Sequence, residues 1–400
     1  MRMKFSVIIA SVFCWVLIFT TGIEAANLRK GPYIIYTNLN TQMKVLWQAD
    51  ETPTDSQIEW GRTTSYQFAS GPLSESGSAE DEHQFSHIIT DLKPSTRYYY
   101  RVSVDIEQAT GSFMTAPPNS ASAVTIYGYG DTQSHPDDHD RVVKALLADV
   151  DTNSDRRQTI TLHSGDWVSD GDDEEVWDGQ YFSREYDYVL NFLSRIAVMG
   201  GRGNHEGSAV LFRKYWPYDY QDSTGCYYSF DYGPLHVAVV DQYVLFFPES
   251  PQYKWLANDL ENTQKPWKFV IMHKPAWSAG GDHDNDYLSQ LFLDPLFEEY
   301  GVAVVHAGHN HYYARCEKEG VQHITSGGGG GRLNTPDPGY PYVVMSDESN
   351  HFIRYEIVGS KMTVTAIRDD GSVIESFELG ESVPEIKSMP WIPLLLLDND

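Results

Sequence analysis

One stretch decides the fold: Ile196-Ala197-Val198-Met199-Gly200-Gly201-Arg202-Gly203-Asn204-His205-Glu206. Its first four residues are continuously apolar, which is typical of a strand buried on both faces. A glycine-rich turn follows, and then an amide, an imidazole and a carboxylate stand next to one another. Because α/β sheets bind ligands beyond the carboxyl ends of their strands, this order predicts a functional site where the strand ends.

The same order occurs at four other places in the second half of the chain. Each is an apolar run ahead of a candidate ligand: 124–127 before Asp131, 159–162 before Asp166, 268–272 before His273, and 302–305 before His309 and His311. Helices are expected between these runs, for example at 141–149 and 288–300, and a β pattern returns at 352–379. Residues 121–380 are therefore expected to form an α/β catalytic domain.

These candidate ligands share one kind of coordination chemistry. Carboxylates, an amide oxygen and imidazoles suit Zn, Fe or Mn, and no cysteine lies nearby to favour a softer site. Delivered from several strand ends, they can hold two divalent cations close together, an arrangement suited to in-line displacement at phosphorus. A single Asp or His is more often a turn or core residue, so this hypothesis depends on the ordered set.

The segment 30–118 has a different pattern, which predicts a small all-β domain. Residues 43–47, 86–89 and 98–104 alternate between apolar and polar, as half-buried strands do. The sequence Leu92-Lys93-Pro94-Ser95-Thr96-Arg97-Tyr98 resembles the tyrosine corner of a fibronectin type III sandwich, in which the tyrosine bonds back to the preceding backbone. We expect a scaffold or partner surface here, and a linker at 115–120.

The composition and the two ends of the chain restrict which partners the protein binds and where it is located. A net charge of −27 argues against a nucleic-acid-binding patch, and it requires local positive charge wherever an anionic phosphate ester binds. Arg2 and Lys4 precede an apolar run that ends near Ile23-Glu24-Ala25, so residues 1–25 are expected to be a signal peptide of a secreted or periplasmic protein. The tail 381–400 is too short in its apolar part to span a membrane, so we expect no membrane span after signal removal.

The ordered blocks resemble those of the calcineurin-like metallophosphoesterase superfamily, and with the fibronectin-like segment the chain is similar to purple acid phosphatases. The resemblance implies a metallophosphatase fold with two mixed β-sheets flanked by helices. It also implies that Asp166 bridges two metals. Asp131 and His311 would hold the first metal, and Asn204, His273 and His309 would hold the second. In the same resemblance His205 protonates the leaving alkoxide, which an imidazole titrating near neutrality suits.

Two positions depart from the family pattern. Purple acid phosphatases carry tyrosine three residues after the bridging Asp, and here that residue is Ser169. The wider superfamily often has His two residues after the first Asp, where this chain has Gln133; either Gln133 or His139 could complete the first site. Glu206 would orient the His205 ring or cap a helix start, and the five glycines 327–331 would offer N–H groups to an anion.

These observations predict an exported binuclear-metal phosphatase that hydrolyses phosphomonoesters through a metal-bound hydroxide, with His205 as the general acid. One alternative is a phosphodiesterase or nucleotidase with the same site. The other is a non-catalytic exported binding protein that uses its β-sandwich. Cys226 and Cys316 are expected either to form a disulfide or to be buried thiols.

Overall fold

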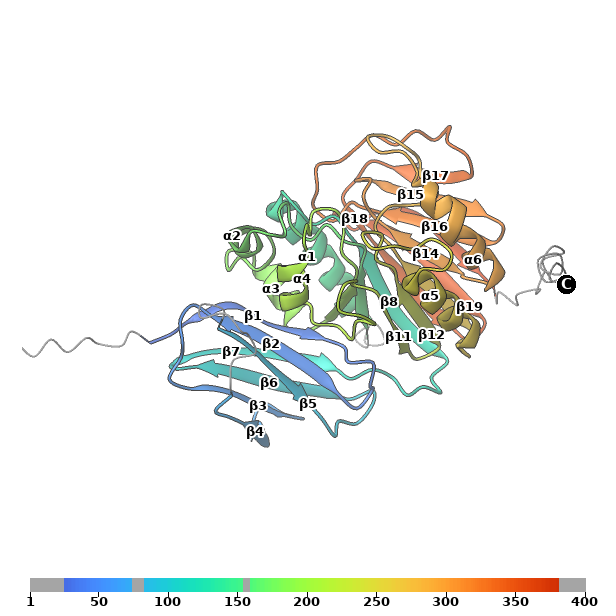
Figure 1. Cartoon of the computed structure of the whole chain (residues 1–400). Helices are drawn as coiled ribbons and strands as arrows, with labels where there is room; N and C mark the ends of the chain where they lie inside the picture. The colour runs from blue at the N-terminus through green and yellow to red at the C-terminus, as the bar shows by residue number, and fades with distance from the viewer. Residues whose placement is uncertain (1–24, 74–82, 154–158, 381–400) are drawn as a thin grey trace, which may run out of the picture.

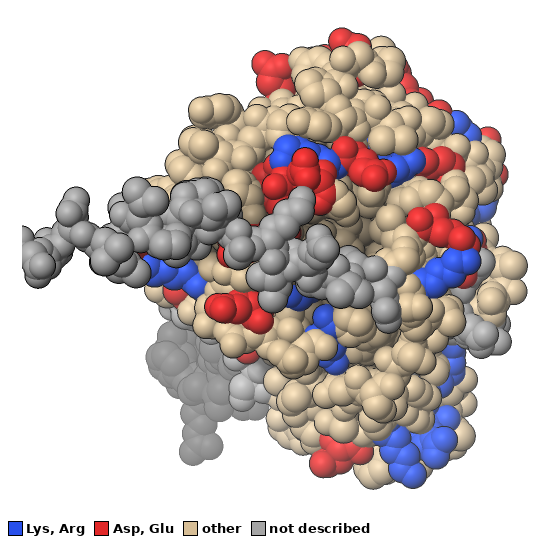
Figure 2. All heavy atoms as spheres, turned by 90° about the vertical axis from the view of Figure 1, so that its right-hand side faces the viewer, with Lys and Arg blue, Asp and Glu red and all other residues tan. Residues whose placement is uncertain are grey.

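The computed structural model describes residues 25–73, 83–153 and 159–380 (Figure 1). The predicted signal peptide, apart from Ala25, and the predicted tail 381–400 lie outside the described residues. Within the described ranges, no helix is long and apolar enough to cross a membrane. On the face shown in Figure 2, Lys and Arg side chains lie interspersed with Asp and Glu.

The first seven strands form two antiparallel sheets that pack face to face. One sheet has the order β1-β2-β5 and the other the order β4-β3-β6-β7. The strands are β1 (Leu28–Ile35), β2 (Met43–Ala49), β3 (Ser56–Gly61), β4 (Phe68–Ser70), β5 (Gln84–Ile89), β6 (Arg97–Val104) and β7 (Glu107–Met114). The tyrosine corner is present, since the backbone N–H of Lys93 donates to the Tyr98 hydroxyl at 3.1 Å.

The rest of the described chain is built on two mixed sheets. The first has the order β10-β9-β8-β18-β19-β20, and its strands are β8 (Ala123–Tyr129), β9 (Ile160–His163), β10 (Ala197–Gly200), β18 (His351–Val358), β19 (Lys361–Arg368) and β20 (Val373–Leu379). The second has the order β11-β12-β13-β14-β16-β15-β17. Its strands are β11 (Tyr228–Tyr232), β12 (Leu235–Val239), β13 (Trp267–Ile271), β14 (Val304–Ala307), β15 (Tyr313–Lys318), β16 (Val321–Ser326) and β17 (Val343–Asp347).

Helices cover the outer faces of these sheets, as Figure 1 shows. They are α1 (Pro136–Thr152), α2 (Glu174–Val176) with the π-helical turn η2 (Trp177–Tyr181), α3 (Asp187–Leu193), α4 (Val210–Tyr215), α5 (Pro251–Asn262), and the π-helical turn η3 (Ser289–Leu293) with α6 (Asp294–Glu299). In α1, Pro136 and two acidic residues suit the helix start, and the buried face is Val142, Val143, Leu146, Leu147 and Val150.

Parallel pairing sets the position of the site. β8, β9 and β10 are parallel neighbours in the first sheet, and β12, β13, β14 and β16 are parallel neighbours in the second. Their carboxyl ends meet along one edge, where the connecting loops supply side chains. The predicted fold class, two mixed sheets flanked by helices behind an all-β segment, is confirmed.

The Cys226–Cys316 disulfide is not formed. Both cysteines are free and fully buried, and burial raises the pKa of each thiol to about 12. They behave as small apolar residues of the core.

Candidate metal centre

Loops from both sheets bring the candidate ligands into one cluster. The ligand atoms form two groups, and within each group they lie within 4.8 Å of one another. The first group is Asp131, Asp166 and His311, and the second group is Asp166, His273 and His309. Asp166 belongs to both. Asp131 and Asp166 are 0% and 1% exposed, so two carboxylates share a site that water barely reaches.

The second group, together with Asn204, converges from four loops, which follow β9, β10, β13 and β14. His273 Nε2 lies 3.2 Å from Asp166 Oδ2, 3.0 Å from Asn204 Oδ1 and 3.1 Å from His309 Nδ1. His273 Nδ1 donates to the Ser164 carbonyl at 2.9 Å, which leaves Nε2 to face the cluster. Three of these atoms thus lie within 3.2 Å of His273 Nε2, and all four are of types that bind a divalent cation.

The pKa shifts in this group also favour a bound cation. Burial lowers the pKa of His273, but the Asp166 carboxylate outweighs it and raises that pKa to about 9. Burial, followed by the repulsion from His273, lowers the pKa of His309 to about 2, so His309 is a neutral imidazole. Although burial raises the pKa of Asp166, His273 and His205 hold it well below the usual range. Asp166 therefore stays ionised, and the buried negative potential favours a positive charge at this point.

The first group is completed by Gln133. His311 donates Nδ1–H to the Arg332 carbonyl at 2.7 Å, and its Nε2 faces Asp131 Oδ1 at 3.5 Å and Gln133 Nε2 at 3.2 Å. The Oε1 atom of Gln133 is buried without a hydrogen-bond partner. The Gln133 amide thus borders the cluster through Nε2, which lies 3.5 Å from Asp166 Oδ2, and turning the amide over would present the unpartnered Oε1 to a cation there.

His139 does not approach the cluster. Its ring is fully buried in α1, its Nε2 lies 3.1 Å from the Tyr129 hydroxyl, and it stacks on Tyr181 at 5.3 Å. Burial lowers its pKa to about 3. Of the two residues considered for the first site, only Gln133 lies within it.

Comparison with known proteins identifies this arrangement. The calcineurin-like phosphoesterase family pattern matches residues 124–313, a range that includes every residue of the cluster, and the N-terminal domain of purple acid phosphatases matches residues 30–124. The chain contains a calcineurin-like phosphoesterase domain behind a purple acid phosphatase N-terminal domain.

Individual relatives agree with this identification. Purple acid phosphatase 15 of Arabidopsis thaliana is 25% identical over 76% of this chain and 65% of its own length, and a purple acid phosphatase of Glycine max is 28% identical over 68% and 62%. The chain thus spans slightly under two thirds of these relatives. The purple acid phosphatase PPD1 from yellow lupin (Lupinus luteus) seeds has the same fold, with a TM-score of 0.76, 16% identity, and coverage of 90% of this chain and 76% of that chain.

Within this phosphoesterase domain, His205 lies beside the cluster rather than in it. Its Nδ1 donates to the Ser169 carbonyl at 2.7 Å, and its Nε2 lies 3.8 Å from Asp166 Oδ2. Its side chain is 37% exposed, so Nε2 can meet both the cluster and a bound substrate. Its own backbone N–H donates to Asp166 Oδ1 at 2.9 Å.

Glu206 plays neither of the roles expected from the sequence. Its carboxylate accepts the backbone N–H groups of Gly203, Asp166 and Trp167 at 2.5, 3.0 and 2.8 Å. It therefore fastens the loop after β10 to the loop after β9. No sequence signal indicates this, because two of its three partners are backbone groups 39 and 40 residues away.

Backbone conformation explains the glycines of the ligand motifs. Asp131, Asp166 and His309 have φ of 57°, 55° and 70°, a left-handed conformation that is concentrated at functional sites. A Cβ at Gly203 would lie 2.1 Å from Asp166 Oδ1, and one at Gly308 would lie 2.1 Å from Asp131 Oδ2. Only glycine allows these backbones to approach the carboxylates so closely.

The glycine run 327–331 packs against the loop after β8. The N–H groups of Gly329 and Gly331 donate to the carbonyls of Gly130 and Asp131 at 2.9 and 2.7 Å. These two donors are therefore occupied within the protein, which differs from the anion-binding role expected for the run.

One neighbour of the cluster was not selected from the sequence. His283 stacks face to face on His309, with ring centroids 4.1 Å apart. The loop around His283 uses polar side chains for hydrogen bonds within the protein: Asn285 accepts from Ser278, and Asp286 accepts the Ser289 N–H.

Proposed function

We propose that this protein is an exported, metal-dependent phosphatase that hydrolyses phosphomonoesters at a binuclear centre. The observation that supports this most directly is the sharing of Asp166 by two ligand groups. A carboxylate has two oxygens and can bridge two cations, and paired cations suit hydrolysis at phosphorus.

The donor set fits two divalent transition metals. Asp131, His311 and Gln133 would hold one ion, Asn204, His273 and His309 would hold the other, and Asp166 would bridge them. All offer oxygen or imidazole nitrogen, which suits Zn, Fe or Mn. When bound, such a pair lowers the pKa of a water molecule and offsets the charge of the phosphate group.

The chain's own residues would then position and protonate the substrate. With Nδ1 bonded to the Ser169 carbonyl, His205 presents Nε2 toward the cluster, where it would give its proton to the departing oxygen. Lys274 follows His273 directly, and none of the salt bridges among the described residues includes it. Its ammonium adds positive charge for a phosphate in a chain of net charge −27.

Export is supported by the first 25 residues, which have the charge and hydropathy of a signal peptide. Sequencing the N-terminus of the protein recovered after secretion or from the periplasm should show cleavage after Ala25. An intact Met1 on the exported protein would contradict this part of the proposal.

The test is a substrate panel on protein reconstituted with Zn, Mn or Fe(II). We expect about two metal equivalents and faster turnover of phosphomonoesters than of phosphodiesters. Asp166→Ala should lose bound metal and several orders of magnitude in turnover, because the cations lose their bridge. Asp370→Ala, in the exposed turn before β20, is the matched control.

Two results would decide against the proposal. Preferred turnover of diesters would favour the phosphodiesterase alternative. Retention of both metals and of normal turnover in Asp166→Ala would show that the ligand assignment is wrong.

A further inference from the structure

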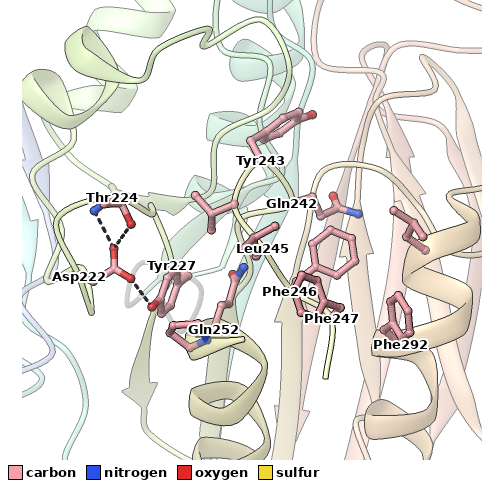
Figure 3. A pocket seen from close by; sticks show the side chains of 13 residues that line it. Asp222, Thr224, Tyr227, Gln242, Tyr243, Leu245, Phe246, Phe247, Gln252 and Phe292 are labelled. Atoms are coloured by element: carbon pink, nitrogen blue, oxygen red, sulfur yellow. Dashed lines mark hydrogen bonds between the residues drawn. The ribbon is translucent and has the colours of Figure 1, made fainter. Parts of the chain in front are cut away.

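An apolar cavity of about 740 Å³ opens between the loop 241–247, the start of α5 and the turn η3 (Figure 3). Aromatic and aliphatic side chains dominate its lining, including Phe246, Phe247 and Phe292. This volume and composition are typical of sites for small organic molecules.

The lining provides no positive charge for a phosphate group. Its one charged residue is Asp222, and that carboxylate already accepts the Tyr227 hydroxyl at 2.5 Å and the N–H groups of Thr224 and Gly225 at 2.7 Å each. An anionic group therefore gains nothing by entering, whereas an apolar group would lose contact with water.

One residue of the cavity lining, Gln242, is hydrogen-bonded to the segment that carries the candidate ligand His273. Gln242 Oε1 accepts the N–H groups of His273 and Lys274 at 3.0 and 2.7 Å. The ring of Tyr243, another lining residue, contacts two cations, with Arg202 at 5.2 Å and Lys274 at 5.4 Å from its centroid. Arg202 lies two residues before Asn204 and Lys274 directly follows His273, so Tyr243 connects the cavity lining to two of the segments that carry candidate ligands.

Apolar side chains also form the rim of the cavity. Leu245, Phe247 and Leu288 are 64%, 44% and 50% exposed, which leaves apolar area in water that a bound group would cover. Because Gln242 joins the cavity to the His273 segment, an ester substituent that leaves the cluster on that side would meet this rim.

We propose that the cavity binds the apolar, preferably aromatic, alcohol part of the phosphomonoester substrate. This inference rests on the proposed phosphatase activity and adds the substrate class to it. It predicts that esters with long apolar groups are distinguished from short ones through KM, because the reacting atoms are the same in both.

The experiment compares phenyl phosphate with 4-biphenylyl phosphate, whose leaving groups have similar acidity. In the double variant Phe247→Gln/Leu288→Gln, KM for 4-biphenylyl phosphate should rise about tenfold, from the apolar area lost. Its kcat and both constants for phenyl phosphate should change less than about twofold. Val358→Gln is the control, because Val358 on β18 is apolar and more exposed than either substituted residue.

Binding of 4-phenylphenol, measured by calorimetry on the metal-loaded protein, separates this inference from the phosphatase proposal. If no ester is hydrolysed but 4-phenylphenol binds and the double variant weakens it, the activity is wrong and the cavity assignment stands. If phenyl phosphate is hydrolysed while both esters respond equally to the double variant, the cavity assignment is wrong. If the protein forms a dimer that the double variant dissociates, and KM does not change, the cavity assignment is also wrong.

Discussion

At the scale of single residues, two neighbours in the chain divide cation binding and proton transfer between them. Asn204 Oδ1 faces His273, whereas His205 is turned toward the Ser169 carbonyl. Two consecutive residues thus serve the cluster and the substrate respectively.

This separation predicts a selective effect of His205→Ala. Metal content should be unchanged, and turnover of alkyl phosphates should fall about 10²–10⁴-fold, the usual contribution of a positioned general acid. Aryl phosphates should lose less, because their leaving groups need little protonation. Steady-state kinetics on both ester types, with metal analysis, tests this, and equal losses would remove His205 from the acid role.

Ser169 leads to a prediction about colour. Purple acid phosphatases carry tyrosine at this place, but here the Ser169 hydroxyl accepts from the Gln180 amide at 2.7 Å. Burial raises the pKa of the nearby Tyr243 well above its usual range, so that phenol stays protonated. A visible spectrum of the aerobically iron-loaded protein should therefore show no strong band in the green-to-orange region. Such a band would mean that another tyrosinate binds iron.

At the scale of elements, the hairpin β11–β12 is fastened to α5 by one histidine. His236 Nδ1 lies 2.9 Å from Asp231 Oδ1, and Nε2 lies 2.8 Å from Asp259 Oδ2. Burial lowers the pKa of His236, but the two carboxylates raise it to about 9, so the ring is protonated at neutral pH.

The raised pKa predicts a pH-dependent contribution to stability. Because the folded pKa lies above the unfolded value of about 6.5, the contribution is fully present below pH 6.5 and is lost as the pH rises through 9. Urea unfolding of His236→Gln should show a loss of about 3 kcal/mol at pH 6 and a much smaller loss at pH 10. An equal loss at both values would contradict this ion-pair account.

The elements were largely predictable from the sequence, and their pairing was not. The apolar runs before Asp131, Asp166, Asn204, His273 and His309 correspond to β8, β9, β10, β13 and β14 within one or two residues. Local patterns cannot show that β18 inserts between β8 and β19, since that pairing joins residues more than 200 positions apart. The roles of Glu206 and His139 were missed for the same reason.

At the scale of the whole molecule, an ion-pair network around a buried lysine joins the β-sandwich to the phosphoesterase domain. The Lys30 ammonium of β1 is fully buried, pairs with Asp178, and lies 3.3 Å from Glu174. Both acids belong to the α2–η2 segment, whose Gln180 accepts the Ser169 N–H at 2.8 Å. The sandwich thus supports the loop that positions His205.

Lys30→Met should therefore affect both stability and activity. Glu174 and Asp178 would keep Arg29 as a partner but lose the buried ammonium, which should cost about 2 kcal/mol of unfolding free energy, and turnover should fall with metal content unchanged. Arg62→Met, exposed in the same sandwich, is the control. Chemical denaturation with parallel kinetics tests this, and wild-type stability in Lys30→Met would show that the network contributes nothing.

The two buried thiols can serve as probes of local opening of the structure. Cys226 lies just before β11 and Cys316 lies within β15, and neither is accessible in the folded state. An alkylating reagent should label each only when its surroundings open, at a rate set by that opening. Mass spectrometry of the two cysteine-containing peptides over time would thus measure how often each part of the second sheet opens locally, without any assay of catalysis.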